Sequence, residues 1–230
     1  MKKDMFIPFL VLLAVTLGCS KIGELTNRAS TSGTNANTNS EATKTAENAP
    51  VSGDHAPSSN ARADVEKLAE RFMTVTSFRA TMNSEGDAPM HTELEFVSPD
   101  RYRIKTGNLM EMIIIGKSTY MKVGDRWQKM PGQLDSTISD MRSTFNKEGM
   151  KWISDVEYTG DETVNGKAAY VYTYHAKGPD KIGENESKLW VGKADGLPIK
   201  VEAVYRSGSM RSMTVEYDYD AAVVIEPPIK

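Results

Sequence analysis

The thiol of Cys19 is the one side chain whose surroundings in the sequence point to a definite chemistry. It is the only cysteine among 230 residues, so the chain cannot form an internal disulfide. It follows directly on a run of apolar residues. We therefore treat Cys19 as a candidate modification site.

Other chemistry-bearing patterns are weak. The three histidines, His55, His91 and His175, are scattered, and without a second thiol their spacing makes no metal site. No nucleophile elbow, phosphate-binding loop or HExxH motif is present. We expect no catalytic residue, no metal and no cofactor, and hence a protein that is not an enzyme.

An acidic stretch forms the remaining candidate for acid–base chemistry. Its members lie close together beside an expected hairpin, and they are Asp155, Glu157, Asp161 and Glu162. We interpret this stretch as the solvated edge of a strand, since charged residues commonly occupy exposed strand edges.

The N-terminus has the layout of an export signal. Lys2 and Lys3 precede an almost wholly apolar run from Met5 to Gly18. A helix of that length is too short to cross a bilayer core of roughly 30 Å, but it fits the apolar region of a secretory signal peptide. We therefore predict that residues 1–18 are removed. The alternatives are an ordinary signal peptide with a chance cysteine, or an uncleaved anchor.

The end of this run, Thr16-Leu17-Gly18-Cys19-Ser20, resembles the lipobox of bacterial lipoproteins. Gly18 and Cys19 match its last positions, whereas Thr16 stands where leucine is most often found. The resemblance implies a diacylglyceryl thioether and an N-acyl chain on Cys19. Several acyl chains on one residue anchor a protein stably, because each buried CH₂ contributes about 0.8 kcal/mol.

Residues 19–60 differ in composition from the rest of the chain. They are rich in Ser, Thr, Asn, Ala and Gly and contain no aromatic residue. Such a segment cannot bury enough apolar surface to offset the entropy of the chain, so we predict a disordered tether. It either lifts a folded domain off the membrane or is simply a tolerated low-complexity segment.

Residues 61–230 hold every tryptophan and tyrosine of the chain, and their number is sufficient for one domain with its own core. The formal net charge of the whole chain is −3. Without a basic patch that interleaves with aromatic residues, nucleic acid is not an expected partner. The oligomeric state cannot be inferred.

Two helices are expected in this domain. Asp64 is a candidate N-cap, and Val65, Leu68, Ala69, Phe72 and Val75 then follow with helical spacing. A second amphipathic helix is predicted after Pro131 and Gly132, where Leu134, Ile138, Met141 and Phe145 recur at intervals of three and four residues.

The other segments alternate with the period of strands, and no strand–helix–strand alternation appears. Strands are expected at 78–82, 92–97, 102–106, 110–115, 119–123, 156–159, 168–175, 188–191, 199–205 and 210–219. Asn165-Gly166 predicts a two-residue hairpin. The predicted fold class is α+β, with one large curved antiparallel sheet forming an incomplete barrel and helices covering its concave face.

The order of several motifs resembles the LolA/LolB/LppX superfamily of periplasmic lipid- and lipoprotein-binding domains. The resemblance covers nearly all of residues 61–230. Its motifs are Thr76-Ser77-Phe78, the run from Phe96 to Arg103, Ile115-Gly116 with Tyr120, Trp127 and Pro131, Gly160 with Val164-Asn165-Gly166 and Tyr170, and Trp190 with Gly196-Leu197-Pro198.

This resemblance implies an incomplete barrel, lidded by helices, over an apolar cavity for acyl chains. The candidate cavity residues are Phe96, Ile104, Met112, Ile114, Trp127, Leu134, Ile138, Met141, Phe145 and Met213. For each methionine and aromatic residue among them, ordinary core packing is the alternative. Ser98 replaces the basic residue that the soluble carrier has before the turn proline, so a release cycle of the carrier's kind is not implied.

The expected function is therefore non-catalytic binding of the acyl chains of a lipid or lipoprotein, for transport or envelope biogenesis. The alternative is a protein-interaction or sensor module of the cell envelope with the same fold and no open cavity. Anchoring through Cys19 places the expected location in the envelope. Ser20 after the cysteine favours the periplasmic face of the outer membrane over the inner membrane, by the sorting rule of enteric bacteria.

Overall fold

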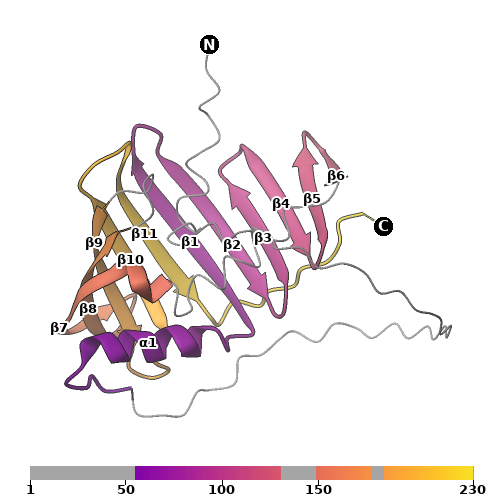
Figure 1. Cartoon of the computed structure of the whole chain (residues 1–230). Coiled ribbons are helices and arrows are strands. Elements are labelled where there is room, and N and C mark those ends of the chain that lie inside the picture. Colours follow the sequence, from indigo (N-terminus) through magenta and orange to yellow (C-terminus); the bar gives the residue numbers. More distant parts are fainter. Residues whose placement is uncertain (1–54, 131–148, 178–183, 230) are drawn as a thin grey trace, which may run out of the picture.

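The computed structural model describes residues 55–130, 149–177 and 184–229. Eleven antiparallel strands form one sheet in the order β6-β5-β4-β3-β2-β1-β11-β10-β9-β8-β7. Strands β6 and β7 are the two edges and do not pair with each other, so the curved sheet is an unclosed barrel (Figure 1). This confirms the predicted fold class of a large, curved antiparallel sheet.

The strand bounds extend most of the predicted segments by a few residues. In chain order the strands are β1 (Ser77–Gly86), β2 (Met90–Val97), β3 (Arg101–Thr106), β4 (Met110–Ile115), β5 (Ser118–Val123), β6 (Arg126–Met130), β7 (Ile153–Val164), β8 (Lys167–Lys177), β9 (Glu184–Gly192), β10 (Pro198–Tyr205) and β11 (Met210–Asp218). The Asn165-Gly166 hairpin is present, with positive φ at both residues as a type I′ turn requires.

Helix α1 (Ala61–Phe72) lies across one end of the sheet (Figure 1). Val65 and Leu68 are buried against Tyr172, Leu189 and Val191 of β8 and β9. We call the sheet face that α1 contacts the inner face. A short 3₁₀ helix, η2 (Gly149–Trp152), precedes β7. The second predicted helix, from Leu134 to Phe145, lies outside the described residues.

The start of α1 differs from the prediction. Asn60, not Asp64, is the N-cap, because its side chain accepts a hydrogen bond from the Ala63 amide at 3.1 Å. Asp64 lies in the first turn, where its carboxylate accepts from the Ser58 amide at 2.8 Å. The helix ends at Phe72. Val75, which the spacing assigned to the helix, therefore lies in the loop that follows, where its side chain is buried.

Contacts with the domain begin before residue 61. The described chain starts at His55, in the segment that the sequence assigns to the tether. A Cβ atom built on Gly196 would lie 2.8 Å from the ring of His55 and 1.9 Å from Nη1 of Arg71. Both side chains therefore approach the β9–β10 turn closely, and Arg71 donates a hydrogen bond to the Gly196 carbonyl at 3.3 Å.

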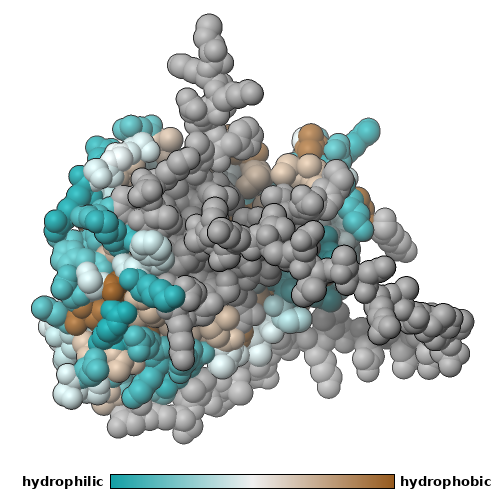
Figure 2. Space-filling view, viewed as in Figure 1, coloured by the Kyte–Doolittle hydropathy of each residue, from teal (hydrophilic) through white to brown (hydrophobic). Residues whose placement is uncertain are grey.

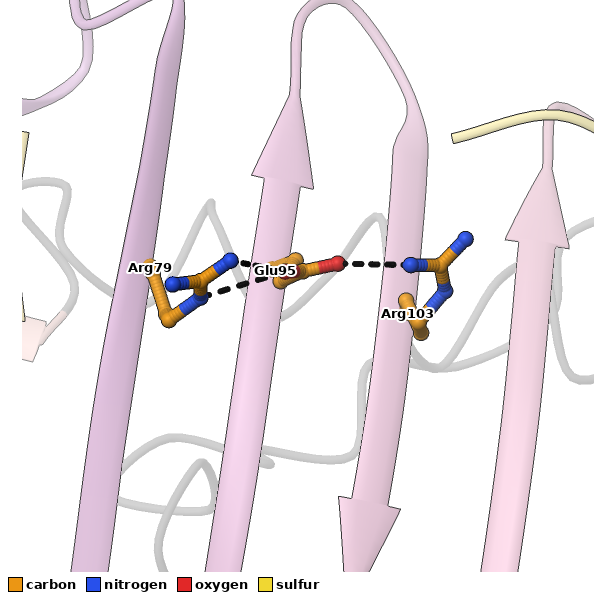
Figure 3. A network of polar contacts seen from close by, with 3 residues as sticks. All are labelled: Arg79, Glu95 and Arg103. Atoms are coloured by element: carbon orange, nitrogen blue, oxygen red, sulfur yellow. Dashed lines mark hydrogen bonds and ion pairs between the residues drawn. The ribbon is translucent and has the colours of Figure 1, made fainter. Parts of the chain in front are cut away.

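The opposite, outer face of the sheet is polar along β1 to β3. Glu95 of β2 accepts hydrogen bonds from Arg79 of β1 at 2.7 and 3.1 Å, and from Arg103 of β3 at 3.0 Å (Figure 3). The hydrogen bond to Glu95 raises the pKa of Arg79. Cross-strand charges of opposite sign stabilise adjacent strands modestly at such half-exposed positions.

The C-terminal segment covers another part of the outer face. Val223 and Ile225 are buried against Ile113 of β4 and Tyr120 of β5. Arg101 donates a hydrogen bond to the Ile225 carbonyl at 2.8 Å, which fixes the segment along the sheet. No helix in the part of the chain that the structure describes has the length and apolar composition needed to cross a membrane.

Gly86 closes the β1 ladder at a bulge, with φ of +152°, and a Cβ atom there would lie 2.1 Å from the Ser209 carbonyl oxygen. We expect Gly86→Ala to lower the free energy of unfolding by about 3 kcal/mol, because strain at such φ values adds to a clash with backbone. Urea unfolding measures this loss. Gly160→Ala is the matched control, since Gly160 has φ of +130° and open space around it. Equal losses in the two variants would contradict the clash.

Candidate functional site: the inner face of the sheet

The strand register defines which side chains share the inner face. One row across nine strands, from β7 to β4, consists of Tyr158, Tyr172, Leu189, Val201, Val215, Met82, Thr92, Thr106 and Met110. None of these side chains is ionised at neutral pH. A long, uncharged surface of this kind can bury apolar ligand surface.

The inner face is tightly packed near helix α1. Phe96 is 0% exposed and Phe78 is 7% exposed. Their ring centroids are 5.3 Å apart, and Tyr102 lies 5.1 Å beyond Phe96. Phe72 of α1 joins the cluster at 5.3 Å from Phe78. These distances are typical of packed aromatic cores, so this end of the inner face is closed.

Methionines distinguish the remainder of the inner face. The register places on it Met82, Met90, Met110, Met112, Met121, Met130 and Met213. All except Met112 are half-buried. Methionine side chains are flexible and polarizable, and they adapt to apolar groups of different shape. This end of the inner face is therefore the part suited to contact a variable apolar ligand.

The structure brings together five of the predicted cavity residues. Phe96, Ile104, Met112 and Ile114 are buried in one cluster, and Met213 packs against it as a half-buried neighbour. Trp127 does not join them. It lies on the outer face of β6, with Ile113 and Tyr120, because its position in the β5–β6 register gives it the opposite orientation. Cys19, Leu134, Ile138, Met141 and Phe145 lie outside the described residues.

The tyrosines of the inner face stay protonated at neutral pH. Burial, with a smaller contribution from the nearby Asp64 carboxylate, raises the pKa of Tyr172. Burial also raises the pKa of Tyr217 and Tyr219, whose rings stack at 6.1 Å. At the edge of the face, a hydrogen bond to Asp161 raises the pKa of Tyr158 to about 12. These hydroxyls therefore add polarity but no charge.

The acidic stretch of β7 is engaged in local pairing. Asp161 accepts hydrogen bonds from Lys193 and Tyr158, which lower its pKa, and Glu162 accepts from Lys188 and Trp190, which lower its pKa as well. Neither carboxyl has the raised pKa expected of a general acid at neutral pH. The interpretation of this stretch as a solvated strand edge agrees with these contacts.

Two surface grooves are lined mainly by polar and charged residues. One, of about 530 Å³, is lined by residues of β7 to β10 that include Glu157, His175, Glu186 and Glu202. The other, of about 270 Å³, lies between the β3–β4 and β5–β6 turns. Figure 2 shows that hydrophilic residues cover most of the visible described surface beside β7, β8 and α1. Charged side chains line both grooves, so neither is the expected apolar cavity.

Comparisons with known proteins add to this geometry. No protein-family model matches the chain, and no curated protein matches it significantly. Among solved structures, the lipoprotein LppX from Mycobacterium tuberculosis is similar with a TM-score of 0.53 and 11% identity, over 72% of this chain and 98% of that protein. LprF from Mycobacterium bovis is similar with a TM-score of 0.54 and 11% identity, over 76% of this chain and 99% of that protein.

The fold is that of LppX and LprF. This confirms the LolA/LppX-like fold that the order of the turn motifs indicates. At 11% identity the likeness carries the arrangement of the strands and no residue of a site. In this fold the inner face carries the row of uncharged side chains from β7 to β4, and five of the residues that the sequence assigns to a cavity lie on it.

The sequence did not predict a polar pair of threonines on the inner face. Thr92 and Thr106 are buried within it, 4% and 3% exposed, and their hydroxyl oxygens lie 3.2 Å apart. The sequence did indicate that Thr92 lies on this face, because in a predicted strand it occupies the same alternate positions as Leu94 and Phe96. Its pairing with Thr106 depends on the β2–β3 register, which alternation alone does not fix.

Proposed function

We propose that this protein is a lipid-anchored envelope lipoprotein that binds acyl chains, without catalysis, on the methionine-lined part of its inner face. The single observation that carries the proposal is the inner face itself. A row of uncharged side chains crosses it from β7 to β4, and half-buried methionines of β1, β2, β4, β5, β6 and β11 lie on it. Folded domains otherwise bury such a surface.

The fold supports the same function. LppX, which shares it, is a lipoprotein. In the chain described here, the candidate anchor is Cys19, and the predicted tether leads from it to the domain. Because anchoring keeps the domain within reach of one membrane, the acyl ligand would come from that membrane or from a lipoprotein in it. The periplasmic face of the outer membrane is the proposed location.

A protein-interaction module with the same fold remains the second candidate. Its supporting observation is the tight packing of the aromatic cluster around Phe96, which is 0% exposed. If the whole inner face packed in this way, no acyl chain could enter. The two candidates differ in whether the methionine-lined part opens to a ligand.

Photo-crosslinking distinguishes them. A fatty acid with a diazirine near the end of its chain is added to the purified full-length protein, which is irradiated and mapped by mass spectrometry. We expect crosslinks at inner-face residues such as Met82, Val201 and Met213. Diazirines label the side chains that surround the acyl chain, so labelling confined to outer-face residues, or no labelling, would contradict acyl binding.

A matched pair of variants sharpens this test. Met213 and Thr214 are adjacent and both half-buried, but they lie on opposite faces of β11. We expect Met213→Lys to reduce the crosslinking yield at least tenfold, because an ammonium group on the inner face must be desolvated by a bound acyl chain. Thr214→Lys should leave the yield within twofold. Similar losses in both variants would show that the effect is not specific to the inner face.

A further inference from the structure

Thr92 and Thr106 form a polar pair within the apolar inner face. Thr92 of β2 lies opposite Thr106 of β3, and both residues are more than nine-tenths buried. Their hydroxyl oxygens are 3.2 Å apart, so one hydroxyl donates to the other. Among the residues that the structure describes, neither hydroxyl has another hydrogen-bond partner.

One of the two hydroxyl hydrogens of the pair therefore has no acceptor within the pair. Two hydroxyls bring two hydrogens, and their mutual hydrogen bond engages one of them. The second hydrogen has no protein acceptor in the described part of the chain. Buried polar groups nearly always have a partner, so a donor left over in a buried site indicates a group that the protein alone does not supply.

The surroundings restrict what that group is. Met82 of β1 lies opposite Thr92, and Met110 of β4 lies opposite Thr106, so a methionine flanks the pair on each side. In the next row toward α1, Leu94 lies opposite Ile104. A buried water needs two to four polar partners, and the two hydroxyls in this apolar setting supply only the minimum of that range. A carbonyl oxygen bonded to a hydrocarbon chain needs one donor and apolar contact around it.

We propose that the Thr92–Thr106 pair binds the carbonyl oxygen of an acyl group, as in a fatty acyl ester, and so positions the ligand on the inner face. This rests on the proposed acyl-binding function and deepens it. The spare hydroxyl hydrogen donates to the carbonyl. The hydrocarbon chain lies over Met82 beside the pair and over the half-buried Met213 and Val201 farther across the sheet. A few placed polar groups commonly fix the orientation of a ligand in an apolar site.

Competition against the photo-crosslinking fatty acid tests this site on the full-length protein. The two competitors are a methyl ester of a long saturated fatty acid and an unbranched alkane of matched length. In the unmodified protein we expect the ester to compete at a concentration roughly three- to tenfold lower than the alkane, the ratio that one added hydrogen bond typically gives.

In the double variant Thr92→Val/Thr106→Val we expect this ratio to fall to about one, because neither side chain can then donate, while the alkane competes as before. The control is Thr81→Val/Thr214→Val, which makes the same change on the outer face of β1 and β11 and should preserve the ratio. Melting temperatures of all variants check that the fold is retained.

The outcomes separate the two proposals. Crosslinking that persists with an unchanged ester preference in Thr92→Val/Thr106→Val overturns the carbonyl site and leaves acyl binding intact. An absence of crosslinking in the unmodified protein overturns acyl binding itself. A water molecule that fills the site instead would give equal competition by ester and alkane in the unmodified protein, which also overturns the carbonyl site.

Discussion

Replacing Cys19 with serine is expected to abolish lipidation of the chain completely. A serine hydroxyl does not form the thioether that carries the diacylglyceryl group, and signal cleavage before the lipidated cysteine then fails as well. Two or more acyl chains hold a protein stably in a membrane, and the serine variant has none of them. The expected product is an unlipidated precursor.

Metabolic labelling with an alkyne fatty acid, followed by membrane fractionation, measures this effect. The parent chain should carry the label and sediment with membranes, and Cys19→Ser should carry none. Ser20→Ala is the matched control, because it changes the next residue without removing the thiol, and it should be labelled like the parent. Equal labelling of Cys19→Ser and the parent would refute the lipoprotein proposal.

The sequence could predict the arrangement of strands because the inner face is apolar and the outer face polar over most of the sheet. Strand β3 shows this clearly, since it alternates buried Tyr102 and Ile104 with more exposed Arg103 and Lys105, and its bounds Arg101–Thr106 nearly match the predicted 102–106. Strand β7 was predicted only from Val156 to Thr159 but runs from Ile153 to Val164. Its alternation is interrupted by two register shifts and by the positive φ of Asp155 and Gly160, which hide the period of a strand.

Features that depend on register were not predictable from alternation. Trp127 was placed among the cavity residues, but a shift of one position turns a side chain to the other face of a sheet, and the β5–β6 pairing directs Trp127 outward. The bridge from Arg79 through Glu95 to Arg103 also requires three strands in one register. The packing of Val223 and Ile225 on β4 and β5 joins segments that no local pattern connects.

The aromatic cluster beneath the proposed site matters because it sets where the inner face is filled. Phe96 lies at its centre, fully buried between Phe78 and Tyr102. Its backbone also pairs with both neighbours, since Phe96 lies opposite Phe78 in β1 and opposite Tyr102 in β3. The side chain therefore joins strands on both sides of β2.

We expect Phe96→Ala to lower the free energy of unfolding by about 3–5 kcal/mol, the usual range for deleting a fully buried aromatic ring. This is a large share of the roughly 5–15 kcal/mol that stabilises a typical domain. Urea unfolding of the full chain, followed by tryptophan fluorescence, measures the loss. Phe96→Leu is the control, because it keeps most of the buried volume and should cost under about 1.5 kcal/mol.

The size of this loss decides the role of Phe96, which the sequence also marked as a cavity residue. In a packed core the removed ring leaves a void that the neighbours cannot fill, and the full cost appears. At the wall of an open cavity the ring has fewer partners to lose. Two results together would contradict a closed inner face near α1: a loss below about 1 kcal/mol in Phe96→Ala, and crosslinks from the photoactivatable fatty acid at Phe78 or Tyr102. The acyl-binding site would then extend to the α1 end of the sheet.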